Sequence, residues 1–219
     1  MNKRPKSLAS KSNIRHIDPD HPELSLICEA ADVVKRGGVV VFPTRTLYGM
    51  GVDAFNAEAV NQVFCVKQRL MHNPLSVLIK SVDAVTSLAA EIPSAAVKFM
   101  ETFWPGRVTI VFKARPDVPS NLTAGTSKIG IRVPEHPVAV KLVVSLDHPL
   151  TGTSANLSGD PGADCIEDLS PEIIKGVNLV IDSGTLKGGI GSTVVDVTTD
   201  PPTIIREGEV SQKELFRIL

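Results

Sequence analysis

The chain has 219 residues, 42% of them hydrophobic and 21% charged, which is typical of a globular protein with one sizeable core or two small ones. Its formal net charge of −1 lacks the basic balance of a protein that binds nucleic acid over its whole surface, so any anion site must be local. Aromatic residues make up 4%, which argues against a base-stacking platform for single-stranded RNA.

The first 16 residues are basic, and the first acidic residue of the chain is Asp18. No apolar segment of a secretory signal stands before it, so we expect residues 1–16 to form a disordered tail, with a transit peptide as the alternative. No internal repeat or change of composition divides residues 17–219, which we expect to form one domain. No apolar run approaches the roughly 18 residues that a membrane-spanning helix needs.

Hydrophobic periodicity predicts helices that alternate with strands along the chain. The helices are expected over residues 24–36, 57–67, 94–104 and 137–146, with a last one after Ser211. The strands are expected over residues 39–42, 75–80, 107–114, 128–134, 178–184, 192–197 and 203–208. Residues 43–51 are predicted to form a loop. The alternation indicates an α/β domain with layers of helices and strands.

The cysteines and histidines show no metal-binding pattern. Cys28, Cys65 and Cys165 lie far apart and lack the CxxC spacing, which fits neither a disulfide framework nor a zinc site. They are expected to be small buried residues in a reducing compartment, so we expect a cytoplasmic protein. The five histidines have no HxxxH or HExxH spacing, so no metal site is expected.

Two cations, Lys67 and Arg69, stand where the second helix is expected to end. Residues two apart on a helix point to different sides, so both serve one site only if the chain leaves the helix between them, near Gln68. Pro74 supports an exit there, because the residue before a proline avoids helical angles. The alternative is a pair of solvated charges that complement the helix dipole.

The polar segment TGTSANLSGDPG covers residues 151–162. Ser154 and Asn156 are two apart, so they would share a face of an extended segment, where a hydroxyl and an amide can hold phosphate or carboxylate oxygens. The spacings of a P-loop and of a GxSxG nucleophile elbow are both absent. The alternative is a polar turn.

Two later segments could also contact an anion. Glycines before Ser192, in GGIGSTVVDV, would let backbone amides approach an anion closely, although a glycine-rich hairpin explains them as well. Arg206, in PPTIIREG, stands at the end of a predicted strand, either as a phosphate clamp or as a surface charge.

The order of these segments is more informative than any one of them. FPTRTLYGMG, KQR followed by NPL, IGIRVPEHP, TSANLSG, GSTVVD and IIREG together resemble the YrdC-like family of L-threonylcarbamoyl-AMP synthases over residues 24–219. The resemblance implies a layered, twisted mixed β-sheet with flanking helices and a concave basic cleft. It also implies that L-threonine, bicarbonate and ATP give threonylcarbamoyl-AMP and diphosphate, for the t6A modification of tRNAs that read ANN codons.

The resemblance also implies roles for particular residues. The catalytic set would be Lys67, Arg69, Ser154 and Asn156. The threonine site would be formed by Thr44, Thr46, Arg132 and Ser192. ATP would contact Lys67, Arg69, Asn156 and Arg206, and Mg²⁺ would arrive with the triphosphate rather than on dedicated protein ligands. Downstream tRNA-modifying proteins are implied partners.

These residue types suit the implied chemistry. A carbamate anion must approach a negative α-phosphate, so two cations at one point would reduce the repulsion, and no side-chain nucleophile is needed. Replacing Lys67 or Arg69 by alanine is therefore expected to remove most turnover and to leave the fold intact. The chain departs from the pattern of relatives at Arg45, Leu70 and Gly191 and in residues 162–165.

Two other functions stay open from the sequence. A double-stranded RNA-binding or tRNA-binding protein could use the same basic cleft for phosphates, but it would not need the serine and asparagine pair or Ser192. A carbamoyl-transfer enzyme could use the same domain with another acceptor.

Overall fold

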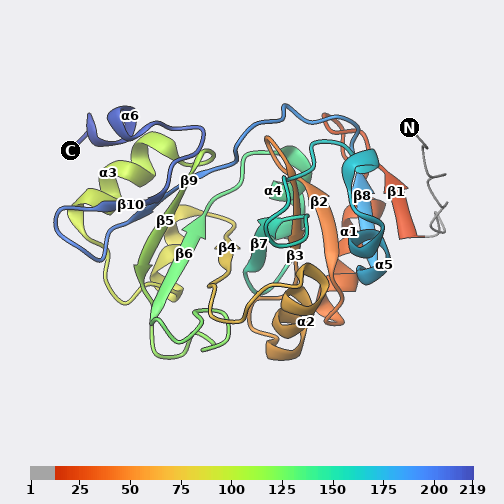
Figure 1. Ribbon diagram of the computed structural model, residues 1–219, viewed down its shortest axis with the longest axis horizontal. Coiled ribbons are helices and arrows are strands. Elements are labelled where there is room, and N and C mark those ends of the chain that lie inside the picture. The colour runs from red at the N-terminus through yellow and green to blue at the C-terminus, as the bar shows by residue number, and fades with distance from the viewer. Residues whose placement is uncertain (1–12) are drawn as a thin grey trace, which may run out of the picture.

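The computed structural model describes residues 13–219, and ten strands in this range form one mixed sheet (Figure 1). The strand order across the sheet is β1-β8-β2-β3-β7-β4-β6-β5-β9-β10. In chain order the strands are β1 (Ile14–His16), β2 (Val40–Pro43), β3 (Tyr48–Gly51), β4 (Ser76–Leu78), β5 (Val108–Lys113), β6 (Lys128–Arg132), β7 (Leu150–Ser154), β8 (Leu179–Asp182), β9 (Thr193–Asp196) and β10 (Thr203–Arg206). The predicted α/β class with a mixed sheet is confirmed.

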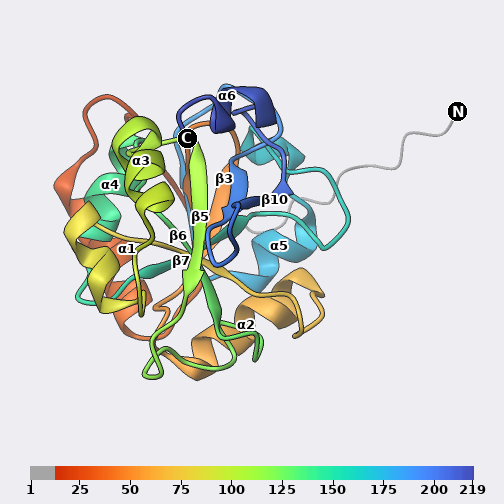
Figure 2. The ribbon, with the colours of Figure 1, turned by 90° about the vertical axis from the view of Figure 1, so that its left-hand side faces the viewer.

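Helices cover both faces of the sheet. They are α1 (Leu24–Lys35), α2 (Ala57–Lys67), α3 (Ser94–Phe103), α4 (Pro137–Val144), α5 (Pro171–Gly176) and α6 (Gln212–Phe216), with 3₁₀ turns at Val82–Ser87 and Ile166–Asp168. Figure 2 shows α1 and α4 on one side of the sheet and α2 and α5 on the other.

Strand β2 shows why both faces are covered. Successive side chains of a strand point to opposite faces. Val40 and Phe42 pack in a core with α1 and α4, whereas Val41 packs in the other core with α2 and α5, and all three are fully buried. A strand that is apolar at every position therefore needs a helix layer on each side.

Helix α2 has the bounds and the cap that the sequence predicts. The Asn56 side chain accepts a hydrogen bond from the Ala59 amide at 3.1 Å, which satisfies one of the free amides of the first turn. At the other end Gln68 adopts a left-handed conformation with φ 50°, so the chain leaves the helix directly after Lys67. The predicted exit between Lys67 and Arg69 is confirmed.

Several expectations are wrong. Strand β1 pairs with β8, so the folded domain includes residues 14–16, which we had placed in the tail; residues 1–12 lie outside the described residues. Residues 43–51 are predicted to form a loop because of their glycines, but residues 48–51 form the fully buried strand β3. Cys28 and Cys65 are exposed rather than buried, and Cys165 is half-buried.

One connection, residues 183–192, runs from β8 near one edge of the sheet to β9 near the other (Figure 1). Along its course the Leu186 amide donates to the Asp164 carbonyl at 2.7 Å, and the Gly188 amide donates to the Thr46 carbonyl at 3.0 Å. The glycine-rich segment before Ser192 is therefore held beside the loop between β2 and β3.

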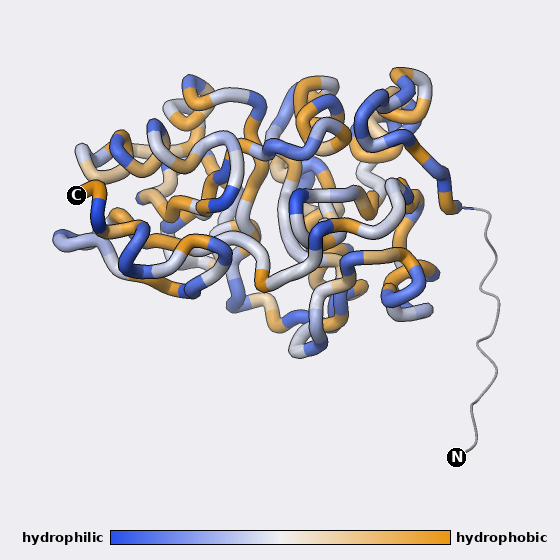
Figure 3. Tube along the Cα trace, turned by 90° about the horizontal axis from the view of Figure 1, so that it is seen from above, coloured by the Kyte–Doolittle hydropathy of each residue, from blue (hydrophilic) through white to orange (hydrophobic). Residues whose placement is uncertain are grey.

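Hydrophobic and hydrophilic residues alternate along the chain in short segments (Figure 3). Among the helices of residues 13–219, none has both the length and the hydrophobicity that a bilayer crossing requires. Hydrophobic side chains instead fill the two cores on either side of the sheet.

Candidate active site

Lys67 is buried at the end of α2 and joins that helix to the end of β7. Only 2% of the residue is exposed. Its Nζ donates to the backbone carbonyl of Ser154, to the Asn156 carbonyl at 2.7 Å and to Asn156 Oδ1 at 3.3 Å. The Ser154 hydroxyl donates to the same Asn156 Oδ1. The structure therefore brings together three of the four residues expected to form the catalytic set.

Burial has a large effect on the Lys67 ammonium. Removal from water lowers the pKa of Lys67 from 10.5 to about 8, and the positive charge of Arg69 contributes in the same direction. Within residues 13–219 no carboxylate forms an ion pair with Lys67, and its acceptors are all uncharged oxygens. The group therefore carries a positive charge that the chain does not neutralise.

Arg69, the fourth member of the expected set, lies on the exit from α2. Its Nε donates to the Asn73 carbonyl at 3.3 Å and its Nη2 to the Pro74 carbonyl at 3.1 Å. Burial and the nearby charge of Arg206 both lower the pKa of Arg69. A cation from the α2 exit and a cation from the end of β10 thus repel each other across the site.

Arg206 and Ser192 lie together at one side of this site. Arg206 Nη2 donates to the Ser192 carbonyl at 2.8 Å, and burial lowers the pKa of Arg206. Ser192 is 8% exposed, and its hydroxyl lies 3.0 Å from the hydroxyl of Thr109. Thr109 was not predicted as a site residue, because it stands in an apolar strand that has no polar pattern.

Arg132, at the end of β6, is half-buried, and one of its donors is unsatisfied. Its Nε is buried and has no hydrogen-bond partner among the described residues. Burial is the main cause that lowers the pKa of Arg132 to about 10. A buried donor without a partner is costly, so an acceptor from a bound molecule would be favourable here.

Thr44 and Thr46 lie in the loop between β2 and β3. The Thr44 hydroxyl donates to the Leu47 carbonyl at 2.6 Å, so part of its hydrogen-bonding capacity is used within the loop. Thr46 is 4% exposed, and its carbonyl accepts from the Gly188 amide. These residues connect the loop to the segment before Ser192.

Between these two threonines, Arg45 forms ion pairs that sequence reasoning missed. Its Nη1 lies 2.7 Å from Glu135 Oε1 and its Nε lies 3.1 Å from Glu209 Oε1, which Lys187 Nζ also approaches at 3.2 Å. These four residues are called the Arg45 cluster below. The partners of Arg45 are 90 and 164 residues away along the chain, so no local pattern could indicate them.

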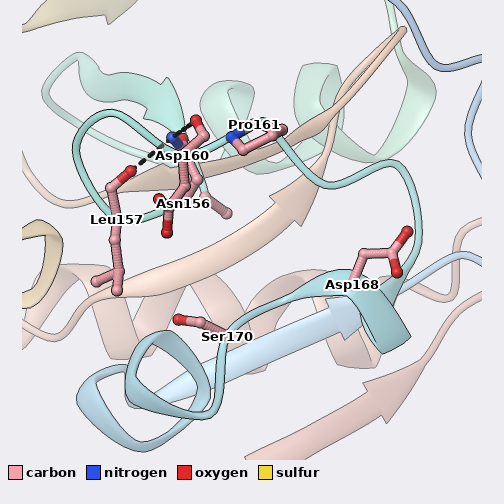
Figure 4. Close-up of a pocket in the computed structure, with 8 residues that line it drawn as sticks. Asn156, Leu157, Asp160, Pro161, Asp168 and Ser170 are labelled. Carbon is pink, nitrogen blue, oxygen red and sulfur yellow. Dashed lines mark hydrogen bonds between the residues drawn. The ribbon is translucent and has the colours of Figure 1, made fainter. Parts of the chain in front are cut away.

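A cavity of about 330 Å³ opens beside Asn156. Asn156 Nδ2 donates to the carbonyls of Leu157 at 2.8 Å and Asp160 at 2.7 Å, and these bonds shape the loop along the cavity wall (Figure 4). Asp168 and Ser170 line the opposite side. The Lys67 group and the cavity therefore share Asn156 as a common wall.

Asp164, Cys165 and Asp168 are the one group of potential metal ligands found in residues 13–219, with ligand atoms within 4.8 Å of one another. The Cys165 thiol donates to Asp168 Oδ2 at 3.2 Å. Exposed acidic groups of this kind are common without an ion, and no second observation points to one here. The absence of a resident metal stays a prediction.

The fold and the site together define an α/β domain with a local cluster of partly buried cations, which suits small anionic ligands. The Sua5/YciO/YrdC family model, described as Telomere recombination, matches residues 32–208, and the chain belongs to this family.

Three relatives illustrate the likeness. A threonylcarbamoyl-AMP synthase of Pyrococcus abyssi is 34% identical over 190 residues, which cover 87% of this chain and 56% of that protein. The structure of P. abyssi Sua5 complexed with L-threonine matches with a TM-score of 0.90 at 33% identity, covering 94% of this chain and 60% of that one. The structure of Escherichia coli YciO matches with a TM-score of 0.85 at 29% identity, covering 94% and 100%. The chain thus spans little more than half of the P. abyssi relatives and the full length of YciO.

Proposed function

We propose that this protein is an L-threonylcarbamoyl-AMP synthase, a nucleotidyltransferase that converts L-threonine, bicarbonate and ATP into threonylcarbamoyl-AMP and diphosphate. Its product would serve the t6A modification of tRNAs that read ANN codons, and we expect this in the cytoplasm. The name of the P. abyssi relative and the L-threonine in the Sua5 structure support the proposal. The observation that carries it is the buried Arg132 Nε, which has no partner in residues 13–219.

An amino-acid carboxylate would satisfy that donor. Charged hydrogen bonds between a guanidinium and a carboxylate are short and strong, and they are often bidentate. Thr109 in β5 and Ser192 directly before β9 place two buried hydroxyls 3.0 Å apart, where they could donate a hydrogen bond to the hydroxyl of threonine or accept one from it. Thr44 and Thr46 would close the same pocket from the loop between β2 and β3.

The other cations suit the phosphates of ATP. Lys67, Arg69 and Arg206 carry positive charges without a carboxylate partner in residues 13–219. In the reaction a carbamate oxygen forms a bond to the α-phosphorus of ATP, and the bond from that phosphorus to the bridging oxygen breaks to release diphosphate. Fixed cations stabilise the charge that develops on the phosphate oxygens, and Mg²⁺ bound to the triphosphate would add to this effect.

Lys67 would act mainly through its charge and its position. The hydrogen bonds of its Nζ go to Ser154 and Asn156, so it holds that segment at the site while its charge acts on the substrates. The burial of Lys67 also distinguishes the proposal from RNA binding. A protein that holds an RNA backbone presents exposed cations, whereas Lys67 is 2% exposed.

The proposal predicts a defined order of amino-acid substrates. In the presence of ATP, Mg²⁺ and bicarbonate, diphosphate release should be fast with L-threonine, slower with L-serine and almost absent with L-valine. Valine lacks the hydroxyl and leaves buried polar groups unpaired, at about 1–3 kcal/mol per group. Serine lacks one methyl group, which costs about 1 kcal/mol.

A reaction without bicarbonate is the control and should release little diphosphate. Equal rates with valine and threonine would show that Ser192 and Thr109 do not read the substrate hydroxyl. No stimulation by any amino acid would contradict the synthase itself and favour the RNA-binding alternative.

A further inference from the structure

Arg45 connects three loops that come from distant parts of the chain. It lies between β2 and β3, whereas Glu135 follows β6 and Glu209 follows β10. Its guanidinium donates a hydrogen bond to one oxygen of each carboxylate, at 2.7 Å to Glu135 and at 3.1 Å to Glu209. Glu135 stands three residues after Arg132, so the cluster lies beside the guanidinium that has no partner.

Both carboxylates influence Arg132 without binding it. The negative charges of Glu135 and Glu209 raise the pKa of Arg132, while burial and the charges of Arg45 and Arg206 lower it. A guanidinium that is partly removed from water ordinarily pairs with a carboxylate whose charge it senses, because an unpaired buried charge is costly. Here the Nε of Arg132 has no partner in residues 13–219, while Arg45 holds both carboxylates.

Each glutamate is also held from a second side. A Cβ atom at Gly106 would lie 2.7 Å from Glu135 Oε2, so the carboxylate rests directly against that glycine. Glu209 Oε1 accepts from Lys187 Nζ at 3.2 Å, and its backbone amide donates to the Gly191 carbonyl at 2.9 Å. These contacts orient the two carboxylates towards Arg45 rather than towards Arg132.

We propose that Arg45 is a positioning residue that keeps Glu135 and Glu209 away from Arg132, so that the Arg132 guanidinium stays free for the carboxylate of a substrate. The identity of that substrate as L-threonine rests on the proposed function, whereas the competition of the two arginines for the two glutamates does not. Without Arg45 the chain's own carboxylates would occupy the substrate site.

Threonine binding by calorimetry is the first test. Arg45→Met keeps most of the side-chain length and removes the charge, and it should weaken L-threonine binding at least tenfold. The triple variant Arg45→Met, Glu135→Gln, Glu209→Gln should recover most of the affinity, because glutamine competes poorly for a guanidinium. If the triple variant binds as weakly as Arg45→Met, Arg45 supports the loop only and the inference is overturned.

The Nε–H signal of Arg132 in ¹H–¹⁵N NMR gives a readout that needs no ligand. Its assignment comes from the signal lost in Arg132→Lys. In the ligand-free protein the signal should move downfield in Arg45→Met, as expected for a new bond to a carboxylate, and should return in the triple variant. Lys187→Met is the matched control. It removes the other cation that contacts Glu209, a lysine whose side chain is 61% exposed, and it should leave the Arg132 signal in place.

The two proposals can fail separately. If the natural protein binds no L-threonine but the Arg132 signal moves as described, the synthase assignment fails and the role of Arg45 stands. If the signal is the same in all four proteins, Glu135 and Glu209 do not compete for Arg132 and the inference is wrong.

Discussion

Lys67 is buried and Arg132 is half-buried, and the two cations differ in the hydrogen-bond partners that the chain provides for them. Lys67 Nζ has three oxygen acceptors from Ser154 and Asn156, whereas Arg132 Nε has none within residues 13–219. A buried polar group with partners contributes to the fold, while one without partners costs free energy until a ligand supplies an acceptor. Lys67 therefore stabilises the folded site, whereas the Arg132 Nε is a donor suited to an acceptor from a bound molecule.

We expect the largest effect on stability and activity from replacing Lys67. Lys67→Met leaves the Ser154 and Asn156 carbonyls without their donor, and bonds to charged groups contribute about 1.5–3 kcal/mol each. We expect the melting temperature, measured by calorimetry, to fall by roughly 5–10 °C in a chain of this size, and diphosphate release to be lost. The expectation that Lys67 could be replaced with the fold intact is therefore revised. An unchanged melting temperature would show that the bonds to residues 154–156 contribute little to folding.

Arg132 should respond in the opposite way. Arg132→Gln removes a half-buried charge whose Nε has no partner within residues 13–219, so the melting temperature should stay the same or rise slightly. L-threonine binding should weaken tenfold to a hundredfold, the equivalent of about 1.5–3 kcal/mol for a charged hydrogen bond. A clear loss of stability with no loss of binding would reverse the contrast between the two cations.

The smallest effect concerns pH. The pKa of Lys67 is lowered to about 8 in the folded protein and returns to 10.5 on unfolding, so between these values the unfolded chain holds more protons. The free energy of unfolding should therefore rise as pH increases from about 8 to 9.5. Denaturant titrations across this range should show the rise in the natural protein and lose it in Lys67→Met. ATP binding should weaken over the same range, because the ammonium loses its charge.

Local signals made much of this fold predictable. The bounds of α2 follow from the Asn56 cap and the apolar spacing after it, and the exit at Gln68 follows from two cations placed two residues apart. Strands such as β2 and β8 follow from their apolar runs, Val-Val-Phe and Leu-Val-Ile. By contrast β3 reads Tyr-Gly-Met-Gly and β7 ends in Thr-Gly-Thr-Ser, so their glycines and hydroxyls look like loop sequence although pairing with neighbours makes them central strands.

The residues of the candidate site likewise differ in how far local sequence signals could predict them. Lys67, Ser154 and Asn156 lie in two short segments whose polar spacing is visible in the sequence, and the structure brings them into contact. Arg45 could not be found in this way, because its partners Glu135 and Glu209 come from the far half of the chain and are placed only by the strand order. The missing partner of Arg132 is likewise a property of the folded chain alone.

The connection from β8 to β9 sets the shape of the whole sheet. These strands stand second and ninth in the order, and at about 4.8 Å for each of the seven steps a flat sheet would hold them about 34 Å apart. The chain from Asp182 to Thr193 reaches roughly 36–40 Å only when it is fully extended, yet it bends at Gly184, Gly188, Gly189 and Gly191, where φ is positive. The sheet must therefore curl. A residue deleted from this connection would tighten the curl, and one inserted would relax it. Because the Gly188 amide is bonded to the Thr46 carbonyl, such a change in length would also move the loop between β2 and β3.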